Sequence, residues 1–282
     1  MYMYILGANS AARRTVKHVH ALFTPRPILA RRGAARRAFI RAHTSFGEMA
    51  ASAASRPRFA AQITQPQAIV DHYQNFAGSE YDAAIESYGY EAHHRIPAQV
   101  LARHSAAHRQ QLRVLDLGCG TGLVAKPFFD EPGSSHEVTG VDVTPAMTES
   151  ARTLPYARVI TATAQDALAN ELAGERFDVV LVCGMMEFVD DPPPFLRQVA
   201  AALAEGGLLG LAVPHKQTFA LEKRFGILTH AFEPMDEALR ACGLTQEWSD
   251  DFNGYILERG KTEVMYRGSL WSRPPAGQQQ QQ

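Results

Sequence analysis

The chain contains little cysteine, no long apolar run and no excess of either charge. Its three cysteines, Cys119, Cys183 and Cys242, include no Cys-x-x-Cys pair, so the 282 residues indicate neither a disulfide framework nor a zinc site. No apolar run reaches the roughly 20 residues that a membrane helix needs. The formal net charge of -1 lacks the basic excess that is typical of nucleic-acid binding. We therefore expect neither a nucleic acid nor a membrane as partner, and a location in the reducing cytoplasm.

The two ends differ in composition from the rest of the chain. Residues 1–65 are rich in arginine and alanine, and up to residue 58 they hold one acidic residue, Glu48. This composition is typical of mitochondrial transit peptides, so the mitochondrial matrix is the alternative location. A disordered leader, or a true start at Met49, would also explain the pattern. Residues 273–282 are rich in proline and glutamine and predict a disordered tail.

Between these ends, short β-rich apolar runs alternate with segments of helical spacing. The apolar runs are residues 114–117, 138–141, 159–163, 179–183 and 208–213. Segments such as 145–153 and 194–203 separate them. Alternation of this kind predicts a parallel sheet with helices on both faces.

The last part of the domain has a different pattern. A helical segment, residues 235–242, is followed by Gly243, a residue that commonly ends helices. Two further apolar runs, 244–248 and 262–266, surround turn signals at Asn253-Gly254 and Arg259-Gly260. We therefore expect a closing antiparallel hairpin.

A glycine-rich segment follows the first apolar run. It reads Asp116-Leu117-Gly118-Cys119-Gly120-Thr121-Gly122, and the next run ends at Asp142. Glycines let the backbone approach a ligand closely, and a carboxylate at the end of the neighbouring strand can accept two ribose hydroxyl protons. The combination predicts a nucleoside-bearing cofactor.

The glycine spacing argues against a dinucleotide. A dinucleotide fingerprint has its third glycine three positions after the second, where this chain has Leu123. Asp116 would also place a negative charge near a diphosphate. S-adenosylmethionine fits better, because it has a sulfonium and an ammonium group, retains the adenosine and lacks phosphate.

These residues resemble the class I S-adenosylmethionine-dependent methyltransferases, whose first motif has the form Asp-x-Gly-x-Gly-x-Gly. From about Tyr73 to Trp271 the pattern is similar to the small-molecule methyltransferases of the type encoded in the Williams-Beuren region. The resemblance implies an α/β fold for residues 66–272. That fold is a doubly wound, mostly parallel, seven-stranded Rossmann-like sheet with a closing hairpin and an N-terminal helical lid.

The function implied by the resemblance is methyl transfer from S-adenosylmethionine to a small-molecule acceptor by in-line displacement. A cofactor-binding but inactive regulatory protein is the alternative. A nucleotide-binding oxidoreductase is disfavoured by the glycine spacing and by the lack of a Tyr-x-x-x-Lys pair.

The resemblance also implies cofactor contacts at the strand ends. Asp116 and the glycines would meet the methionine part, Asp142 the ribose, Met147 the adenine face and Asp166 the adenine amino group. The full set of predicted cofactor-binding residues is Tyr81, Asp116, Gly118, Cys119, Gly120, Asp142, Val143, Met147, Asp166, Ala167 and Cys183.

Catalytic residues are harder to identify. Where many relatives have an Asn and a His after the fourth strand, this chain has Gly184 and Phe188, and a phenylalanine cannot accept a proton. Glu187 is one candidate base. His215, just after the fifth strand, is the other.

An aromatic segment and four histidines precede the first apolar run. The aromatic segment 73–90 predicts a lid, with Tyr81 near the methionine end and Tyr88 or Tyr90 as a substrate wall; packing of helices onto the sheet would explain it equally. Four histidines precede the first strand without a His-Glu-x-x-His pattern, so no metal is predicted. They are His93, His94, His104 and His108.

Overall fold

A computed structural model describes most of the domain that the sequence predicts. The described residues are 65–75, 78–106, 111–133, 135–215, 228–257 and 262–275. Nearly all of the predicted leader, most of the predicted tail and His108 lie outside them. No helix within these ranges is both long and apolar enough to cross a bilayer.

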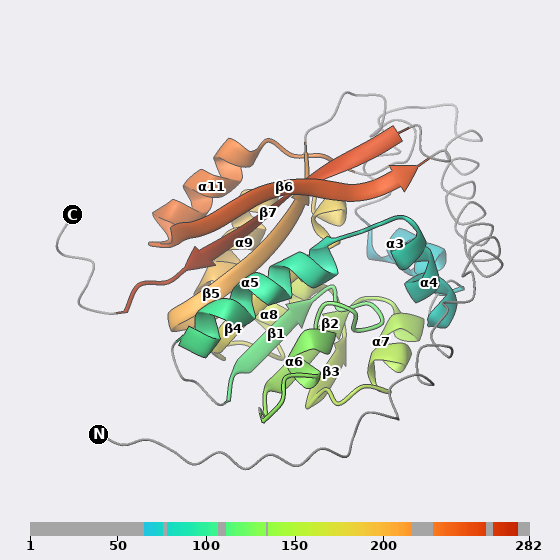
Figure 1. Cartoon of the computed structure of the whole chain (residues 1–282), viewed down its shortest axis with the longest axis horizontal. Coiled ribbons are helices and arrows are strands. Elements are labelled where there is room, and N and C mark those ends of the chain that lie inside the picture. Colours follow the sequence, from blue (N-terminus) through green and yellow to red (C-terminus); the bar gives the residue numbers. More distant parts are fainter. Residues whose placement is uncertain are drawn as a thin grey trace, which may run out of the picture.

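The described strands form one seven-stranded sheet with the order β3-β2-β1-β4-β5-β7-β6 (Figure 1). The strands are β1 (Arg113–Leu117), β2 (Glu137–Asp142), β3 (Arg158–Thr161), β4 (Phe177–Cys183), β5 (Leu203–Pro214), β6 (Thr245–Leu257) and β7 (Thr262–Ser272). Strands β1 to β5 are parallel, whereas β7 runs antiparallel to both β5 and β6. The predicted doubly wound fold with a closing hairpin is therefore confirmed.

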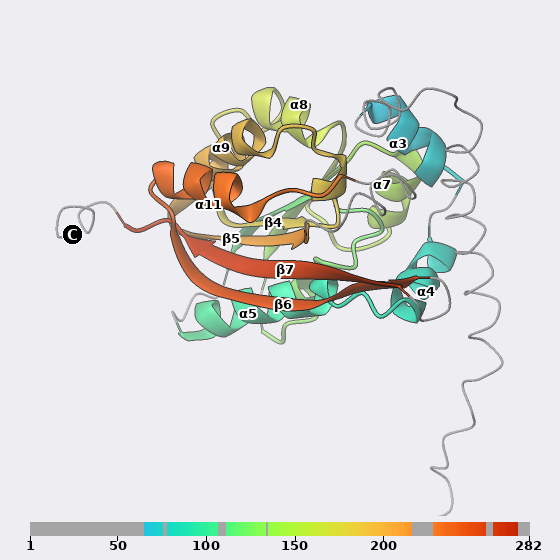
Figure 2. The ribbon, with the colours of Figure 1, turned by 90° about the horizontal axis from the view of Figure 1, so that it is seen from above.

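Helices cover both faces of the sheet. They are α3 (Pro66–Tyr73), α4 (Ser79–Ser87), α5 (Ala92–Ala106), α6 (Lys126–Phe129), α7 (Pro145–Ala151), α8 (Ala164–Ala169), α9 (Pro192–Ala202) and α11 (Phe232–Ala241), with a 3-10 turn η2 (Met186–Phe188). Figure 2 shows α8, α9 and α11 on one side of the sheet and α5 on the other. Helix α11 ends before Gly243, whose φ of 80° matches the predicted helix stop.

The central strands are buried on both faces, as parallel strands between helices must be. In β4, Val179 and Leu181 pack into the cluster that contains α5, while Val180 and Val182 pack into the cluster that contains α9. Burying apolar side chains is worth about 25 cal/mol per Å². The two clusters therefore hold the sheet rigid beneath the loops at its carboxyl edge.

One turn prediction was wrong. Asn253-Gly254 lies inside β6, at a register irregularity between Asn253 and Tyr255, and the hairpin strands are longer than the apolar runs suggested. A Cβ at Gly254 would overlap the ring of Tyr266. Gly254 is therefore needed so that the ring of Tyr266 can pack closely against the backbone. In the sequence alone, a packing glycine after Asn looks the same as a turn glycine.

We predict that Gly210→Ala destabilises the fold. The added Cβ would overlap Cγ2 of Ile96 on α5 and lie 3.2 Å from Cδ2 of Leu181, and overpacking of this kind costs about 1–3 kcal/mol. Urea unfolding measures the change in the free energy of unfolding. The double variant Gly210→Ala/Ile96→Ala should lose less free energy of unfolding than the two single variants lose together. Simple additivity of the losses would contradict the proposed overlap.

Candidate cofactor-binding site

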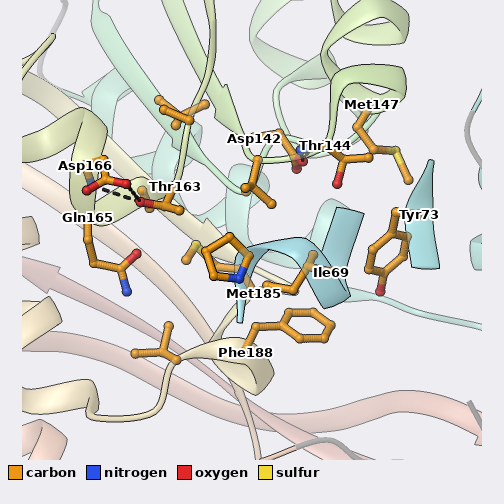
Figure 3. Close-up of a pocket in the computed structure, with 18 of the residues that line it drawn as sticks. Ile69, Tyr73, Asp142, Thr144, Met147, Thr163, Gln165, Asp166, Met185 and Phe188 are labelled. Carbon is orange, nitrogen blue, oxygen red and sulfur yellow. Dashed lines mark hydrogen bonds between the residues drawn. The ribbon is translucent and has the colours of Figure 1, made fainter. Parts of the chain in front are cut away.

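A cavity of about 280 Å³ lies at the carboxyl ends of β1, β2, β3 and β4 (Figure 3). Its walls come from the glycine turn after β1, from residues 141–144 and 162–166 after the next two strands, and from residues 184–189 after β4. Helix α3 closes it through Pro66, Ile69 and Tyr73. This is the edge at which open α/β sheets bind ligands.

The glycine turn presents bare backbone to the cavity. Gly118 and Gly120 have φ values of 72° and 53°, a region that residues with a side chain rarely adopt. A Cβ at Gly118 would lie 2.9 Å from Cβ of Met185. The amides of Gly118 and Cys119 donate to the carbonyl of Val141 at 2.8 and 2.9 Å, which joins the turn to the end of β2.

Asp142 lines the cavity and also organises it. Its Oδ2 accepts a hydrogen bond from the amide of Gly120 at 3.0 Å, and its Oδ1 accepts one from the amide of Thr144 at 2.8 Å. Burial raises the pKa of this carboxyl, and the two backbone donors oppose the rise. A carboxylate has about four acceptor positions, so Asp142 can still accept hydrogen bonds from a ligand.

Asp116 is buried behind the glycine turn, with 1 % of its surface exposed, and does not line the cavity. Its Oδ2 accepts a hydrogen bond from the hydroxyl of Tyr156 at 2.8 Å, whereas Oδ1 has no partner among the described residues. Burial raises the pKa of Asp116 to about 7, the negative charge of Asp142 adds to the rise, and the bond from Tyr156 opposes it.

The opposite end of the cavity is formed by the start of α8. Thr163 caps that helix: its Oγ1 accepts from the amide of Asp166 at 3.0 Å and donates to the Asp166 carboxylate at 2.7 Å. Figure 3 shows these two side chains and Gln165 at one end of the cavity, with Tyr73 and Met147 at the other. Asp166 is held close to the cavity by this cap.

The structure brings together about half of the predicted cofactor residues around one cavity. Those that line it are Gly118, Gly120, Asp142, Val143, Met147 and Asp166. Cys119, Ala167 and Cys183 are instead buried in the core, and Tyr81 packs beside the cavity, edge-on to Tyr73 with ring centroids 6.1 Å apart.

Two helices of the segment predicted to form a lid contact the site. Tyr73 of α3 lines the cavity and meets Phe188 edge-on at 6.1 Å. Thr121 donates a hydrogen bond to Asp82 of α4 at 2.6 Å, which ties this helix to the glycine turn. Tyr88 and Tyr90 are buried in the core. Their burial fits the packing alternative rather than a substrate wall.

Neither candidate base lines the cavity. Glu187 is buried, and its Oε1 accepts a hydrogen bond from the hydroxyl of Tyr266; burial raises the pKa of Glu187. His215 follows β5, with Nε2 2.9 Å from Oδ1 of Asp251, an ion-pair distance without hydrogen-bond geometry. Residues 216–227, which follow His215, lie outside the described residues.

Several residues of the site were missed by sequence reasoning, and Tyr156 and Ile69 show why. Tyr156, which binds Asp116, stands 40 positions away in an irregular segment before β3, where no motif marks it. Ile69 belongs to α3, a short helix in which no motif marks a cavity wall. Both depend on contacts between segments distant in sequence.

The charges around the cavity suit a cationic nucleoside. None of the described residues that line it is Lys, Arg or His, whereas Asp142 and Asp166 are acidic and Asp116 lies just behind the turn. When ionised, Asp116 would attract an ammonium group in the cavity from behind the turn. A diphosphate would meet these carboxylates with like charge and no neutralising side chain.

Comparison with known proteins agrees with this site. A family model described as a methyltransferase domain matches residues 67–250, which is more than half of the chain. The chain belongs to this methyltransferase family. The match confirms the prediction of a class I S-adenosylmethionine-dependent methyltransferase and of its cofactor. The more specific similarity to the Williams-Beuren-region proteins stays a prediction.

Curated relatives of this methyltransferase include ubiquinone biosynthesis O-methyltransferases. That of Cereibacter sphaeroides (strain ATCC 17025 / ATH 2.4.3) is 37 % identical over 108 residues, covering 36 % of this chain and 40 % of the relative. That of Bradyrhizobium sp. (strain ORS 278) is 33 % identical over 170 residues, covering 57 % and 62 %. The chain thus spans less than two thirds of the length of each.

Solved structures share the fold of this methyltransferase. Magnesium protoporphyrin IX methyltransferase from Synechocystis PCC 6803, with bound SAH, has a TM-score of 0.54 at 16 % identity and covers 74 % of this chain and 99 % of its own. Burkholderia thailandensis 1,6-didemethyltoxoflavin-N1-methyltransferase has a TM-score of 0.53 at 21 % identity, covering 79 % and 92 %. At these identities the similarity shows the fold alone.

We predict that Tyr156→Phe weakens cofactor binding about tenfold. The change leaves Asp116 without its hydroxyl donor but keeps the ring, which packs edge-on against Phe129. A hydrogen bond to a charged group contributes about 1.5–3 kcal/mol, and about 1.4 kcal/mol corresponds to tenfold. Calorimetric titration with S-adenosylmethionine measures the effect. Tyr88→Phe is the matched control, and equal affinities for the two variants would contradict the role of Tyr156.

We also predict opposite pH effects on binding and on stability. Since the pKa of Asp116 is about 7, affinity for the cationic cofactor should rise from about pH 6 to about pH 7.5 as the carboxyl ionises. The folded state holds this proton more tightly than the unfolded state, where the pKa is 3.8. The free energy of unfolding of the cofactor-free protein should therefore fall as pH rises from about 4 to about 7.

Asp116→Asn separates these effects from other titrations. It should remove the contribution of this group from both profiles, which calorimetry and urea unfolding at several pH values can follow. Profiles that keep their slopes in Asp116→Asn would show that another group is responsible.

Proposed function

We propose that this methyltransferase transfers the methyl group of S-adenosylmethionine to a small-molecule acceptor. The observation that carries the proposal is the cofactor cavity, over which α3 places Tyr73 edge-on to Phe188. The net charge of -1 gives no long-range attraction for a nucleic acid.

Each predicted cofactor contact has a place in this proposal. Asp142 would accept the ribose hydroxyls, and Asp166 would accept the adenine amino group. The backbone of Gly118 and Gly120 would pack against the methionine part, while Asp116 would attract its ammonium group from behind the turn. When bound, S-adenosylmethionine supplies a methyl group on a positively charged sulfur. Positioning of the acceptor can then contribute about 7–11 kcal/mol to lowering the barrier.

The lining favours an acceptor with an apolar body. Ile69, Met185 and Phe188 offer carbon and sulfur surfaces on the side of the cavity opposite Asp142 (Figure 3). The names of the ubiquinone biosynthesis O-methyltransferases support oxygen as the methylated atom. We therefore propose a hydroxyl group on an apolar, ring-bearing molecule, in keeping with the small-molecule resemblance of the sequence.

His215 is our first candidate for accepting the hydroxyl proton. It stands at the carboxyl end of β5, at the same sheet edge as the cavity, and the carboxylate of Asp251 would stabilise the imidazolium formed. Glu187 is the second candidate, because its carboxyl faces Tyr266 rather than the cavity. The other function to test is cofactor binding without turnover. It is favoured by Phe188 on the cavity wall, at the position where the resemblance to small-molecule methyltransferases implies a histidine.

A thermal shift experiment tests the cofactor site. At a hundredfold excess over the dissociation constant, S-adenosylmethionine should stabilise the protein by about 2.7 kcal/mol. Asp142→Ala should lose most of this shift, since it removes both the ligand acceptor and the tie to Gly120. His215→Ala should keep the full shift. An unchanged shift in Asp142→Ala would remove the ribose assignment.

Turnover separates an enzyme from a cofactor-binding regulator. Methyl transfer should be detected on phenols and catechols in a panel that also contains amines and thiols. With the best acceptor, His215→Asn should lower kcat by about 100-fold or more and leave the KM for the cofactor unchanged, because a general base contributes about 10²–10⁴-fold. Cofactor binding without transfer to any acceptor would support the regulator instead.

A further inference from the structure

A group of metal-ligating side chains lies outside the cofactor cavity, at the corner between α4 and α5. It consists of Glu86, near the end of α4, with His93 and His94 in the first turn of α5. One potential ligand atom from each residue lies within 4.8 Å of the others. Glu86 and His94 are exposed, so the group is open to solvent on one side.

His93 is buried without any polar partner. Its exposed fraction is 3 %, and neither of its ring nitrogens has a hydrogen-bond partner among the described residues. Its ring stacks on Tyr90, with centroids 5.8 Å apart, and lies 3.9 Å from the ring of His94. Buried polar atoms are normally paired, and leaving one unpaired costs about 1–3 kcal/mol. A ligand for this imidazole would remove that penalty.

We propose that Glu86, His93 and His94 bind a divalent transition-metal ion, with Zn²⁺ as the best fit. Two imidazoles and one carboxylate form a ligand set that Zn²⁺ accepts, with water in the fourth position. Mg²⁺ and Ca²⁺ prefer sites made of oxygen atoms and suit this set poorly. The ligands come from two helices and follow no metal-binding motif, which is why the sequence predicts no metal.

The placement of His93 suits a metal ligand, because both of its ring nitrogens are buried without a hydrogen-bond partner among the described residues and its ring lies beside that of His94. Only a neutral imidazole can donate a nitrogen lone pair to a metal ion. The exposed side chains of Glu86 and His94 can rotate toward it without disturbing the core.

Bound metal would fasten the lid to the body of the domain. Glu86 belongs to α4, which is tied to the glycine turn, and both histidines belong to α5, which packs on the sheet. Tyr90 connects the group to the site: it stacks on His93, and its Oη would lie 3.1 Å from a Cβ at Gly184, a residue that lines the cavity. Zn²⁺ should therefore raise the melting temperature of the full chain.

Calorimetric titration of the EDTA-treated full chain with ZnCl₂ tests the proposal. We expect the chain to bind one Zn²⁺ ion at this group, and to give no comparable heat with MgCl₂. Glu86→Gln and His94→Gln should each weaken binding of this ion by at least about 10- to 100-fold, because that is the loss seen when only a residue hydrogen-bonded to a metal ligand is removed. Glu91→Gln, which removes a nearby carboxylate paired with Arg95, should bind Zn²⁺ like the wild type.

The controls make a negative result decisive. Glu86 and His94 are exposed, so both variants should fold and keep the thermal shift with S-adenosylmethionine, which does not involve them. Absence of Zn²⁺ heat in the wild type would overturn the proposal. It would also be overturned if both variants kept the wild-type affinity, since the ion would then be held by other residues.

Discussion

The site depends on the way in which Asp142 fastens two strand ends together. Its carboxylate accepts the amides of Gly120 and Thr144, so one side chain holds the turn after β1 and the start of the segment after β2. Both acceptor bonds are charge-assisted and are therefore stronger than bonds between neutral groups. Without them the glycine turn would be joined to the end of β2 only through the carbonyl of Val141. A residue that lines the cavity thus also holds the neighbouring walls in place.

Negative charge in a partly dry environment is the second constraint. Burial raises the pKa of both Asp116 and Asp142, and the negative charge of Asp142 raises that of Asp116 further. A cationic ligand relieves this repulsion, while an anionic one would increase it. Tyr156 limits the penalty by donating to Asp116. Selectivity for a sulfonium cofactor over a dinucleotide therefore follows from charge as well as from glycine spacing.

Much of the fold and part of the site could be predicted because their signals are local. Apolar alternation identified every parallel strand, although β5 and the hairpin strands proved longer than expected. Asp142 and Gly118 were recognisable because strand, turn and acid follow one another within a short segment. Asn253-Gly254 was misread because a packing glycine and a turn glycine look the same in sequence. Cys183 and Ala167 were assigned to the cofactor but are buried in the core.

The sequence by itself determined the class of fold, the family and the cofactor, because glycine spacing and hydrophobic period are properties of neighbouring residues. Only the tertiary structure decided which side chains meet. It paired Tyr156 with Asp116, turned Glu187 toward Tyr266 and brought Glu86 beside His93. Such contacts join residues that are separated along the chain, and their geometry is set by how helices pack on the sheet. No local pattern encodes that packing.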